Sequence, residues 1–357
     1  MTTRSIFYKT APNSTVIHRT LRRVVLGLGA LALIAAFGCG ELPDDLGGKE
    51  PPTVTFVGPL PRWISWSKQS DAIVFEQAGR LVVARGDDLK DARAITGYSE
   101  YNHPSWSPDG RWIVHDHPMD GFRGDDIWAR SATQDALPVR FTMSHLRDYM
   151  PKWSADGRWI AFHSRRNPTG HVWMISADVE ADERIPEPVA PALDREDSLA
   201  WSPTGARLAF VALVNQSIDI WVVDGPDGEA SLLGGTSVSD NQPRWTPDGT
   251  AVGFISGSGA GANVWVQEDR PGAQPRKLTD VGGIKRFYWL MDGKALAYLT
   301  DDNALYALSL EEGAAPVHLR DTVDFAASPD GRRYVYVERV DNVYRHFADR
   351  FPPPFQP

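Results

Sequence analysis

Short apolar or alternating segments, separated by turn residues, make up most of the chain after residue 50. Examples are RLAFV at residues 207–211 and ALAYL at residues 295–299, each of which follows a glycine-containing turn. Many short strands joined by frequent turns are typical of all-β proteins. The pattern of apolar and polar positions therefore predicts an all-β fold.

One sequence unit recurs along this pattern. The clearest copies read SWSPDGRWIV at residues 105–114 and KWSADGRWIAF at residues 152–162. Further copies are WSPTG at 201–205, WTPDG at 245–249, WLMDG at 289–293, ASPDG at 327–331 and a degenerate WS at 66–67. The spacing of roughly 40–50 residues is the period of β-propeller blades.

The chemistry of the unit fits a β-hairpin. In Ser-Pro-Asp-Gly, proline presets the first central residue of a type I turn, and glycine accepts a positive φ. A third segment pairs an apolar residue with an aromatic one, as in Val264-Trp265, and a fourth strand follows in most copies. Four strands per period predict a propeller of four-stranded blades, with seven blades. We interpret the abundant Trp, 13 in the chain, as packing between blades.

The repeat resembles the WD40-like β-propeller repeat (PD40) of the TolB family over about residues 59–345. The resemblance implies the propeller fold and a TolB-like, noncatalytic role in the cell envelope, in which the propeller binds a protein or glycan partner. Two features depart from the family. TolB has a separate α/β domain before its propeller, for which residues 40–58 are too short, and TolB is not lipidated.

The ring is expected to close through the N-terminal segment. After the last repeat the chain runs into the prolines of residues 352–354, which cannot donate hydrogen bonds to a sheet. The last blade then has three strands of its own. The β-rich segment TVTFV at residues 53–57 can supply the fourth strand and cover the exposed edges. We place the propeller at residues 52–349 and a Pro-rich tail at residues 350–357.

The N-terminal segment reads as a secretory signal. Arg22 and Arg23 precede an apolar run over residues 24–37, which is too short for a comfortable membrane span. The sequence AFGC at residues 36–39 resembles a bacterial lipobox, with Cys39, the only cysteine of the chain, as the lipidated residue. An ordinary signal peptide and a buried structural cysteine are the alternatives. We therefore predict a lipoprotein signal peptide at residues 1–38.

The lipobox resemblance also implies a location. Gly40 stands where an Asp would retain a lipoprotein, so an outer-membrane lipoprotein facing the periplasm or the cell surface is expected. Residues 39–51 are polar and rich in Gly and Pro, which predicts a flexible tether.

Charge and cysteine content exclude several classes of function. The chain has a net charge of −9, and its first 38 residues contain basic but no acidic residues, so the remainder is more acidic still. Such a body disfavours nucleic acid as a partner. A single cysteine excludes an intramolecular disulfide and a cysteine-based zinc site. We expect a monomer without a cofactor.

The candidate site lies in the loops before each blade's Trp, at one end of the propeller's channel. These channel-mouth positions are polar and differ from blade to blade. The predicted partner-binding residues are Arg147, Asp148, Tyr149, Asp197, Asp240, Asn241, Lys285 and Arg286. In the other blades the corresponding positions are residues 62–63, 101–103 and 322–324. The alternative is that the Asp and Asn side chains cap their own turns.

Catalytic readings have weaker support. Some propeller lyases hold a metal through histidines, and His103 and His145 lie in channel-side loops, but no metal-binding spacing is present and none is predicted. We interpret the histidines of blades two and three as solvated hairpin residues. Prolyl oligopeptidase-like enzymes need a Gly-x-Ser-x-Gly elbow in a following domain. The sequence GSGAG at residues 257–261 lies inside a blade hairpin, so peptidase activity is not expected.

The sequence thus leads to two hypotheses. The first is a lipid-anchored, noncatalytic propeller that binds an envelope protein or a glycan. The second is a propeller enzyme that acts on polysaccharide, such as a metal-assisted lyase.

Overall fold

The structure is a computed structural model. It describes residues 53–54, 62–69, 71–85, 91–97, 102–118, 124–166, 171–191, 193–205, 207–236, 238–340 and 343–355. The chain divides into two compact units, Met1–Lys49 and Glu50–Pro357. The predicted signal peptide, Cys39 and the tether lie outside the described residues.

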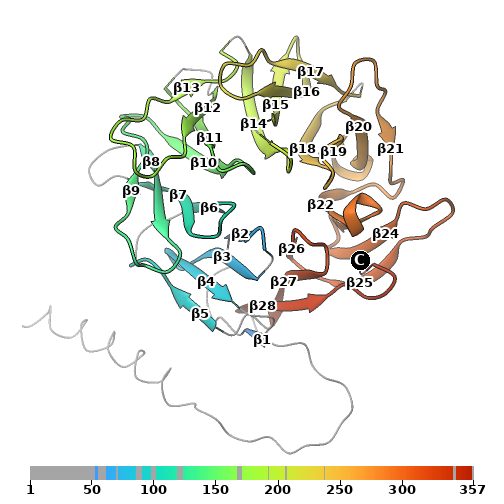
Figure 1. The fold of residues 1–357 in the computed structure, drawn as a ribbon. Coiled ribbons are helices and arrows are strands. Elements are labelled where there is room, and N and C mark those ends of the chain that lie inside the picture. The colour runs from blue at the N-terminus through green and yellow to red at the C-terminus, as the bar shows by residue number, and fades with distance from the viewer. Residues whose placement is uncertain are drawn as a thin grey trace, which may run out of the picture. The chain divides into compact units, whose positions relative to one another are not determined.

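The second unit is a ring of seven antiparallel four-stranded sheets, which confirms the predicted propeller (Figure 1). Blades 1 to 3 consist of β2 (Arg62–Trp66), β3 (Ala72–Gln77), β4 (Arg80–Arg85), β5 (Asp91–Ala94), β6 (Asn102–Trp106), β7 (Trp112–Pro118), β8 (Asp125–Ser131), β9 (Val139–Arg140), β10 (Asp148–Trp153), β11 (Trp159–Ser164), β12 (His171–Ser176) and β13 (Glu187–Pro188).

Blades 4 to 6 consist of β14 (Asp194–Trp201), β15 (Arg207–Val214), β16 (Ser217–Asp224), β17 (Ser231–Gly234), β18 (Asp240–Trp245), β19 (Ala251–Ser256), β20 (Asn263–Glu268), β21 (Arg276–Lys277), β22 (Ile284–Leu290), β23 (Ala295–Thr300), β24 (Ala304–Ser309) and β25 (Val317–Asp321). Blade 7 contains β26 (Asp324–Ala327), β27 (Arg333–Val340), β28 (Val343–Arg350) and β1 (Thr53–Val54). Two 3-10 turns, η1 (Gly259–Gly261) and η2 (Met291–Gly293), complete the described elements. No helix among the described residues is both long and apolar enough to cross a membrane.

The repeated Ser-x-Asp-Gly turn forms the first hairpin of a blade. In blade 2, the Ser107 hydroxyl donates to the Asp109 carboxylate, 2.5 Å away, and accepts from the Trp112 amide at 2.9 Å. Gly110 has a φ of 71°, which glycine adopts without the steric cost of a side chain. Blades 3, 5 and 7 repeat the bond from the hydroxyl to the carboxylate. The turn predicted from the sequence is therefore a side-chain-locked hairpin.

The blade tryptophans join neighbouring blades, as predicted. We use this term for the Trp that ends each innermost strand, Trp66, Trp106, Trp153, Trp201, Trp245 and Trp289, with Ala327 in its place in blade 7. The Trp106 indole donates to the Ser65 carbonyl of blade 1 at 3.1 Å, and the Trp245 indole donates to the Ala200 carbonyl of blade 4 at 3.0 Å. Trp153 differs, because its indole bonds within its own blade.

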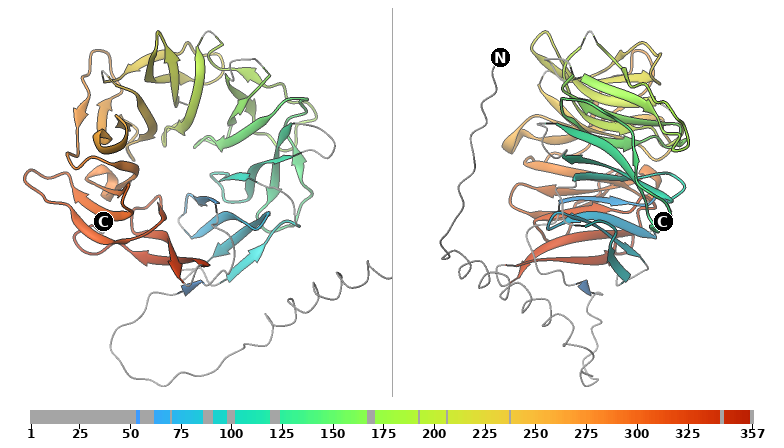
Figure 2. Two further views of the ribbon diagram at one scale, coloured as in Figure 1. Left: turned by 180° about the vertical axis from the view of Figure 1, so that it is seen from behind. Right: turned by 90° about the vertical axis from the view of Figure 1, so that its left-hand side faces the viewer.

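An N-terminal strand closes the ring, also as predicted. β1 pairs antiparallel with β28, with Thr53 opposite Phe347 and Val54 opposite His346. Blade 7 therefore takes its outermost strand from the start of the domain and its other three from the end (Figure 2). Pairing the first and last segments in one sheet hides an edge that would otherwise be free.

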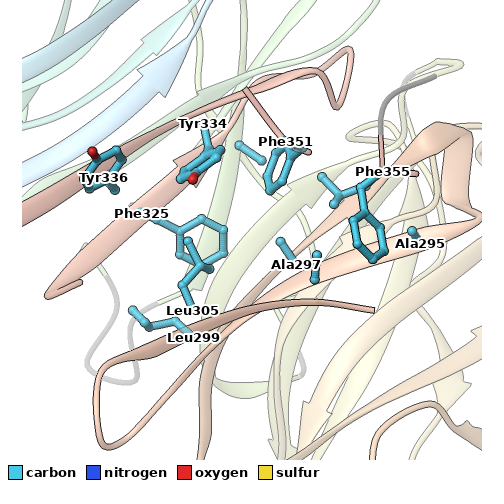
Figure 3. Close-up of a cluster of buried hydrophobic side chains, with 12 residues drawn as sticks. Ala295, Ala297, Leu299, Leu305, Phe325, Tyr334, Tyr336, Phe351 and Phe355 are labelled. Atoms are coloured by element: carbon cyan, nitrogen blue, oxygen red, sulfur yellow. The ribbon is translucent and has the colours of Figure 1, made fainter. Parts of the chain in front are cut away.

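The Pro-rich segment packs into blade 7. Phe351 and Phe355 are buried, and the Phe351 ring centroid lies 4.6 Å from that of Tyr334. Figure 3 shows both phenylalanines against the side chains of blades 6 and 7, including Leu305 and Phe325. Two side chains of the last described segment, Phe351 and Phe355, are thus part of the core.

Candidate functional site

The innermost strands β2, β6, β10, β14, β18, β22 and β26 surround the central axis of the ring (Figure 1). Each begins on one face of the propeller, which we call the mouth face. The Ser-x-Asp-Gly turns lie at the other ends of these strands. The predicted channel-mouth residues therefore belong to the starts of the innermost strands, and most are strand residues instead of loop residues.

Five successive blades have the same distortion in the innermost strand. In β10 the register shifts between Tyr149 and Lys152, and Met150 has a φ of 55°. The third residue before the blade tryptophan is left-handed in each case: Trp63, His103, Met150, Ser198 and Gln242. Such conformations cost about 1–3 kcal/mol at a non-glycine residue and are concentrated at functional sites. A β-bulge also redirects a side chain.

We call the residues at this third position, together with Arg286 and Asp324 of blades 6 and 7, the inner ring. Two pairs of members from adjacent blades contact each other. The rings of Trp63 and His103 lie 3.9 Å apart between centroids. The Arg286 guanidinium pairs with the Asp324 carboxylate at 2.9 Å. Residues separated widely in sequence thus meet around the axis.

His103 is held by a buried carboxylate. Its Nδ1 lies 2.8 Å from the Asp116 Oδ1, and the exposed fractions of the two residues are 8% and 0%. His103 Nε2 is buried and has no hydrogen-bond partner among the described residues. In a neutral imidazole, a carboxylate on Nδ1 favours the tautomer in which Nε2 is the hydrogen-bond acceptor. The pair can therefore bind a donor group or act as a general base.

Three cations lie close to the same axis. Lys152 and Arg244 each stand one residue before the blade tryptophan, and Arg286 belongs to the inner ring. Burial, with the positive charges of Arg244 and Arg286, lowers the pKa of Lys152 to about 8, and the Asp116 charge opposes this shift. The Arg244 Cζ lies 3.9 Å from the Tyr288 ring centroid. The centre of this acidic protein is therefore locally cationic.

The structure corrects two predicted site residues. Asp148 and Asp240 are fully buried, and burial raises the pKa of each carboxyl. Asp148 accepts from the Ser164 hydroxyl at 2.6 Å, and Asp240 accepts from the Thr236 amide at 2.7 Å. Both carboxylates are bonded within their own blades. They therefore match the alternative of structural capping, and they are not accessible to a partner.

The structure describes the side chains of five further predicted site residues. Arg147 pairs with Asp125 and lies 5.0 Å from the Tyr149 ring centroid. Lys285 bonds to Asn303 at 2.6 Å. Arg147, Tyr149, Asn241, Lys285 and Arg286 are all half-buried at the mouth face. The side chain of Asp197 lies outside the described residues.

The histidine interpretation was wrong for three residues. His103, His115 and His163 are buried instead of solvated, and burial lowers the pKa of His115 to about 3. His145 is exposed, as expected for a loop residue. The described part of the chain has no group of three or more His, Cys, Asp or Glu side chains that could hold a metal ion. The residues of the GSGAG sequence form the turn with η1 between β19 and β20.

Sequence reasoning missed the cationic centre. Lys152 and Arg244 are not among the predicted site residues, because they lie within the innermost strands and not in the loops before them. Both residues stand directly before the blade tryptophan, and this shared position in the repeat is the signal that could have identified them. Met150, Ser198 and Gln242 have no such signal in residue type, because none of them predicts a left-handed backbone.

A family model, the TolB beta propeller domain, matches residues 150–345. The chain belongs to this family. The match covers blades 3 to 6 and most of blade 7, and the structure shows that residues before 150 complete the same TolB-type ring. No curated protein matches the sequence.

Solved structures support the fold. An oligogalacturonate lyase from Vibrio parahaemolyticus has a TM-score of 0.64 and 12% identity, covering 86% of this chain and 93% of the lyase. An oligogalacturonate lyase in complex with manganese has a TM-score of 0.63 and 12% identity, covering 82% and 89%. TolB from Acinetobacter baumannii has a TM-score of 0.47 and 15% identity, covering 62% of this chain and 55% of TolB. The chain thus spans about half of that TolB, and these likenesses concern the fold alone.

Proposed function

We propose that this TolB-type propeller is a noncatalytic, lipid-anchored protein of the bacterial cell envelope that binds a protein or glycan partner at its mouth face. The lipid anchor at Cys39 and the outer-membrane location rest on the sequence of residues 1–40. The binding role rests on the geometry of the mouth face and on membership of the family.

The observation that carries the proposal is the strained bulge in five successive innermost strands. A repeated backbone cost at one level of the ring is retained when it positions side chains for binding. These side chains differ in size and polarity from blade to blade, as recognition of a patterned surface requires. Rigid strands below them hold the arrangement in place.

Charge reversal at the mouth face tests the proposal. Lys285→Glu should weaken capture of an envelope partner from extract, while it changes the free energy of unfolding by only about 0.5 kcal/mol, the scale of surface substitutions. The effect should shrink as salt rises, because such charges act partly through the association rate.

The matched control is Lys277→Glu on β21, the outermost strand of blade 5. It makes the same charge change away from the mouth face and should leave capture unchanged. Equal losses in the two variants would indicate a net-charge effect, and no loss in either would place the binding surface elsewhere.

A second candidate function is an enzyme that acts on acidic polysaccharide. The His103–Asp116 pair, with a buried and unpartnered Nε2, favours it, because this arrangement is that of a general base. The fold is shared with oligogalacturonate lyases. Among the described residues, no group of three or more His, Cys, Asp or Glu side chains fits a metal ion. Incubation with oligogalacturonate, followed by the absorbance of an unsaturated product, separates this candidate from binding alone.

A further inference from the structure

Two of the three cations around the axis have no carboxylate partner in the described part of the chain. Among the described residues, no hydrogen bond or ion pair joins the Lys152 ammonium or the Arg244 guanidinium to a carboxylate, and Arg244 Nε is buried without a partner. Arg286 does have a carboxylate partner, Asp324. Partly buried charges without a counter-ion are costly, so their retention points to a ligand that supplies one.

The position of these side chains is set by the blade repeat. The residue before the blade tryptophan is small in four blades, namely Ser65, Ser105, Ala200 and Ala326. Blades 3, 5 and 6 have Lys152, Arg244 and Tyr288 there instead. The Arg244 Cζ lies over the Tyr288 ring, 3.9 Å from its centroid. This contact positions the Arg244 guanidinium without using its N–H donors.

Two further features belong to the innermost strands of blades 1 and 2. The exposed fraction of Trp63 is 41%, although its ring contacts the buried His103 ring. His103 Nε2 is a buried polar atom without a partner in the described part of the chain. An exposed aromatic face and a hydrogen-bonding nitrogen, on the same ring of innermost strands as the cations, suit a sugar ring that carries an anionic substituent.

We propose that the centre of the ring binds the carboxylate of an acidic sugar, with Lys152, Arg244 and Arg286 as the charged contacts and Trp63 as a stacking surface. This inference rests on the proposed function, because it names the chemistry of the partner that the mouth face receives. Arg244 presents planar donors that match a carboxylate, whereas Lys152 supplies a point charge. A neutral sugar lacks the group that these cations require.

The test is calorimetric titration of the soluble propeller with a trimer of galacturonic acid and, in parallel, with its fully methyl-esterified form. Binding of the free acid, with the ester at least about 10-fold weaker, is the expected result, since removal of one buried charge partner costs at least this factor. Lys152→Met and Arg244→Met should each weaken binding of the free acid by a similar factor. The control Lys277→Met should leave it unchanged.

Several results would overturn the inference. Equal binding of acid and ester would show that the carboxylate is not recognised. Binding of acetate as tight as that of the trimer would show a simple anion site without sugar recognition. Absence of trimer binding, with a peptide carrying a free C-terminal carboxylate bound instead, would assign the cations to a protein ligand.

The same experiments distinguish failure of the acidic-sugar inference from failure of the proposed function. If the trimer fails to bind but Lys285→Glu still abolishes capture of an envelope partner, only the acidic-sugar inference falls. If the trimer binds and Lys285→Glu has no effect on capture, the cation site stands and the mouth-face partner does not.

Discussion

At the scale of single residues, backbone strain and unpaired charge both occur in the innermost strands. The left-handed residues Trp63 and His103 contact each other, and Lys152 lies two positions after the left-handed Met150 of its own strand. Each feature costs free energy by itself. The blade hairpins and the indole bonds between blades supply the stability that tolerates this cost.

Lys152→Met should stabilise the free protein. The pKa of Lys152 in the folded state, about 8, is below its ordinary value of 10.5, so the folded state disfavours the charged form at neutral pH. Arg244 and Arg286 add repulsion, and Asp116 offsets part of it. Removal of the charge should raise the free energy of unfolding at pH 7 by about 1–3 kcal/mol, since one pKa unit corresponds to about 1.4 kcal/mol.

The sign of the pH dependence follows from proton binding. Between about pH 8 and pH 10.5 the unfolded wild type binds more protons than the folded state, so its stability rises with pH through this window. Urea titrations at pH 7 and pH 10 should therefore show the gain of Lys152→Met shrinking at the higher pH. A variant that is less stable than the wild type at pH 7 would contradict the assigned environment.

At the scale of secondary-structure elements, the blade hairpins are local and the closure is not. The Ser107–Asp109 turn forms within a few residues of sequence. By contrast, β1 pairs with β28 across nearly the whole domain, so blade 7 is complete only after both ends have come together. Closure of such a long loop carries an entropy cost that the local hairpins do not have.

Deletion of residues 51–58 should destabilise the propeller more than deletion of residues 40–48. Only the first removes β1, whose pairing with β28 contributes roughly 1 kcal/mol for each hydrogen bond. We expect a melting temperature a few degrees lower for the first truncation. Equal melting temperatures for the two truncations would show that the N-terminal strand does not stabilise the ring.

At the scale of the whole molecule, an acidic body surrounds a cationic centre. The net charge of −9 disfavours nonspecific adhesion to anionic lipid, and the proposed lipid at Cys39 would supply the membrane attachment. A local positive field within a negative body directs an anionic ligand toward the axis.

Cys39→Ser should abolish lipid attachment and leave an uncleaved precursor or a mislocalised soluble protein. Several acyl chains hold a protein on a membrane firmly, whereas one chain binds only marginally. Labelled fatty acid in the wild type but not in the variant is the expected result. Equal labelling of the two would show that Cys39 is not the lipidated residue.

The sequence by itself determined the blade architecture. The repeat period, the Ser-x-Asp-Gly turn and the position of the blade tryptophans depend on contacts within a blade or between neighbours in the chain, and these contacts recur in most copies. Closure by the segment that contains β1 (Thr53–Val54) was also predictable, because a blade with three strands leaves an edge to be paired.

Only the tertiary structure decided which residues form the site. The sequence predicts Asp148 and Asp240 as exposed loop residues, but both are buried. Asp148, for example, accepts a hydrogen bond from Ser164 of the second strand of its blade. His103 is hydrogen-bonded to Asp116 at a bulge in the innermost strand, and no residue type in the sequence predicts that bulge. Lys152 and Arg244 come together because ring closure brings blades 3 and 5 to one axis, a relation between distant segments that a local pattern does not contain.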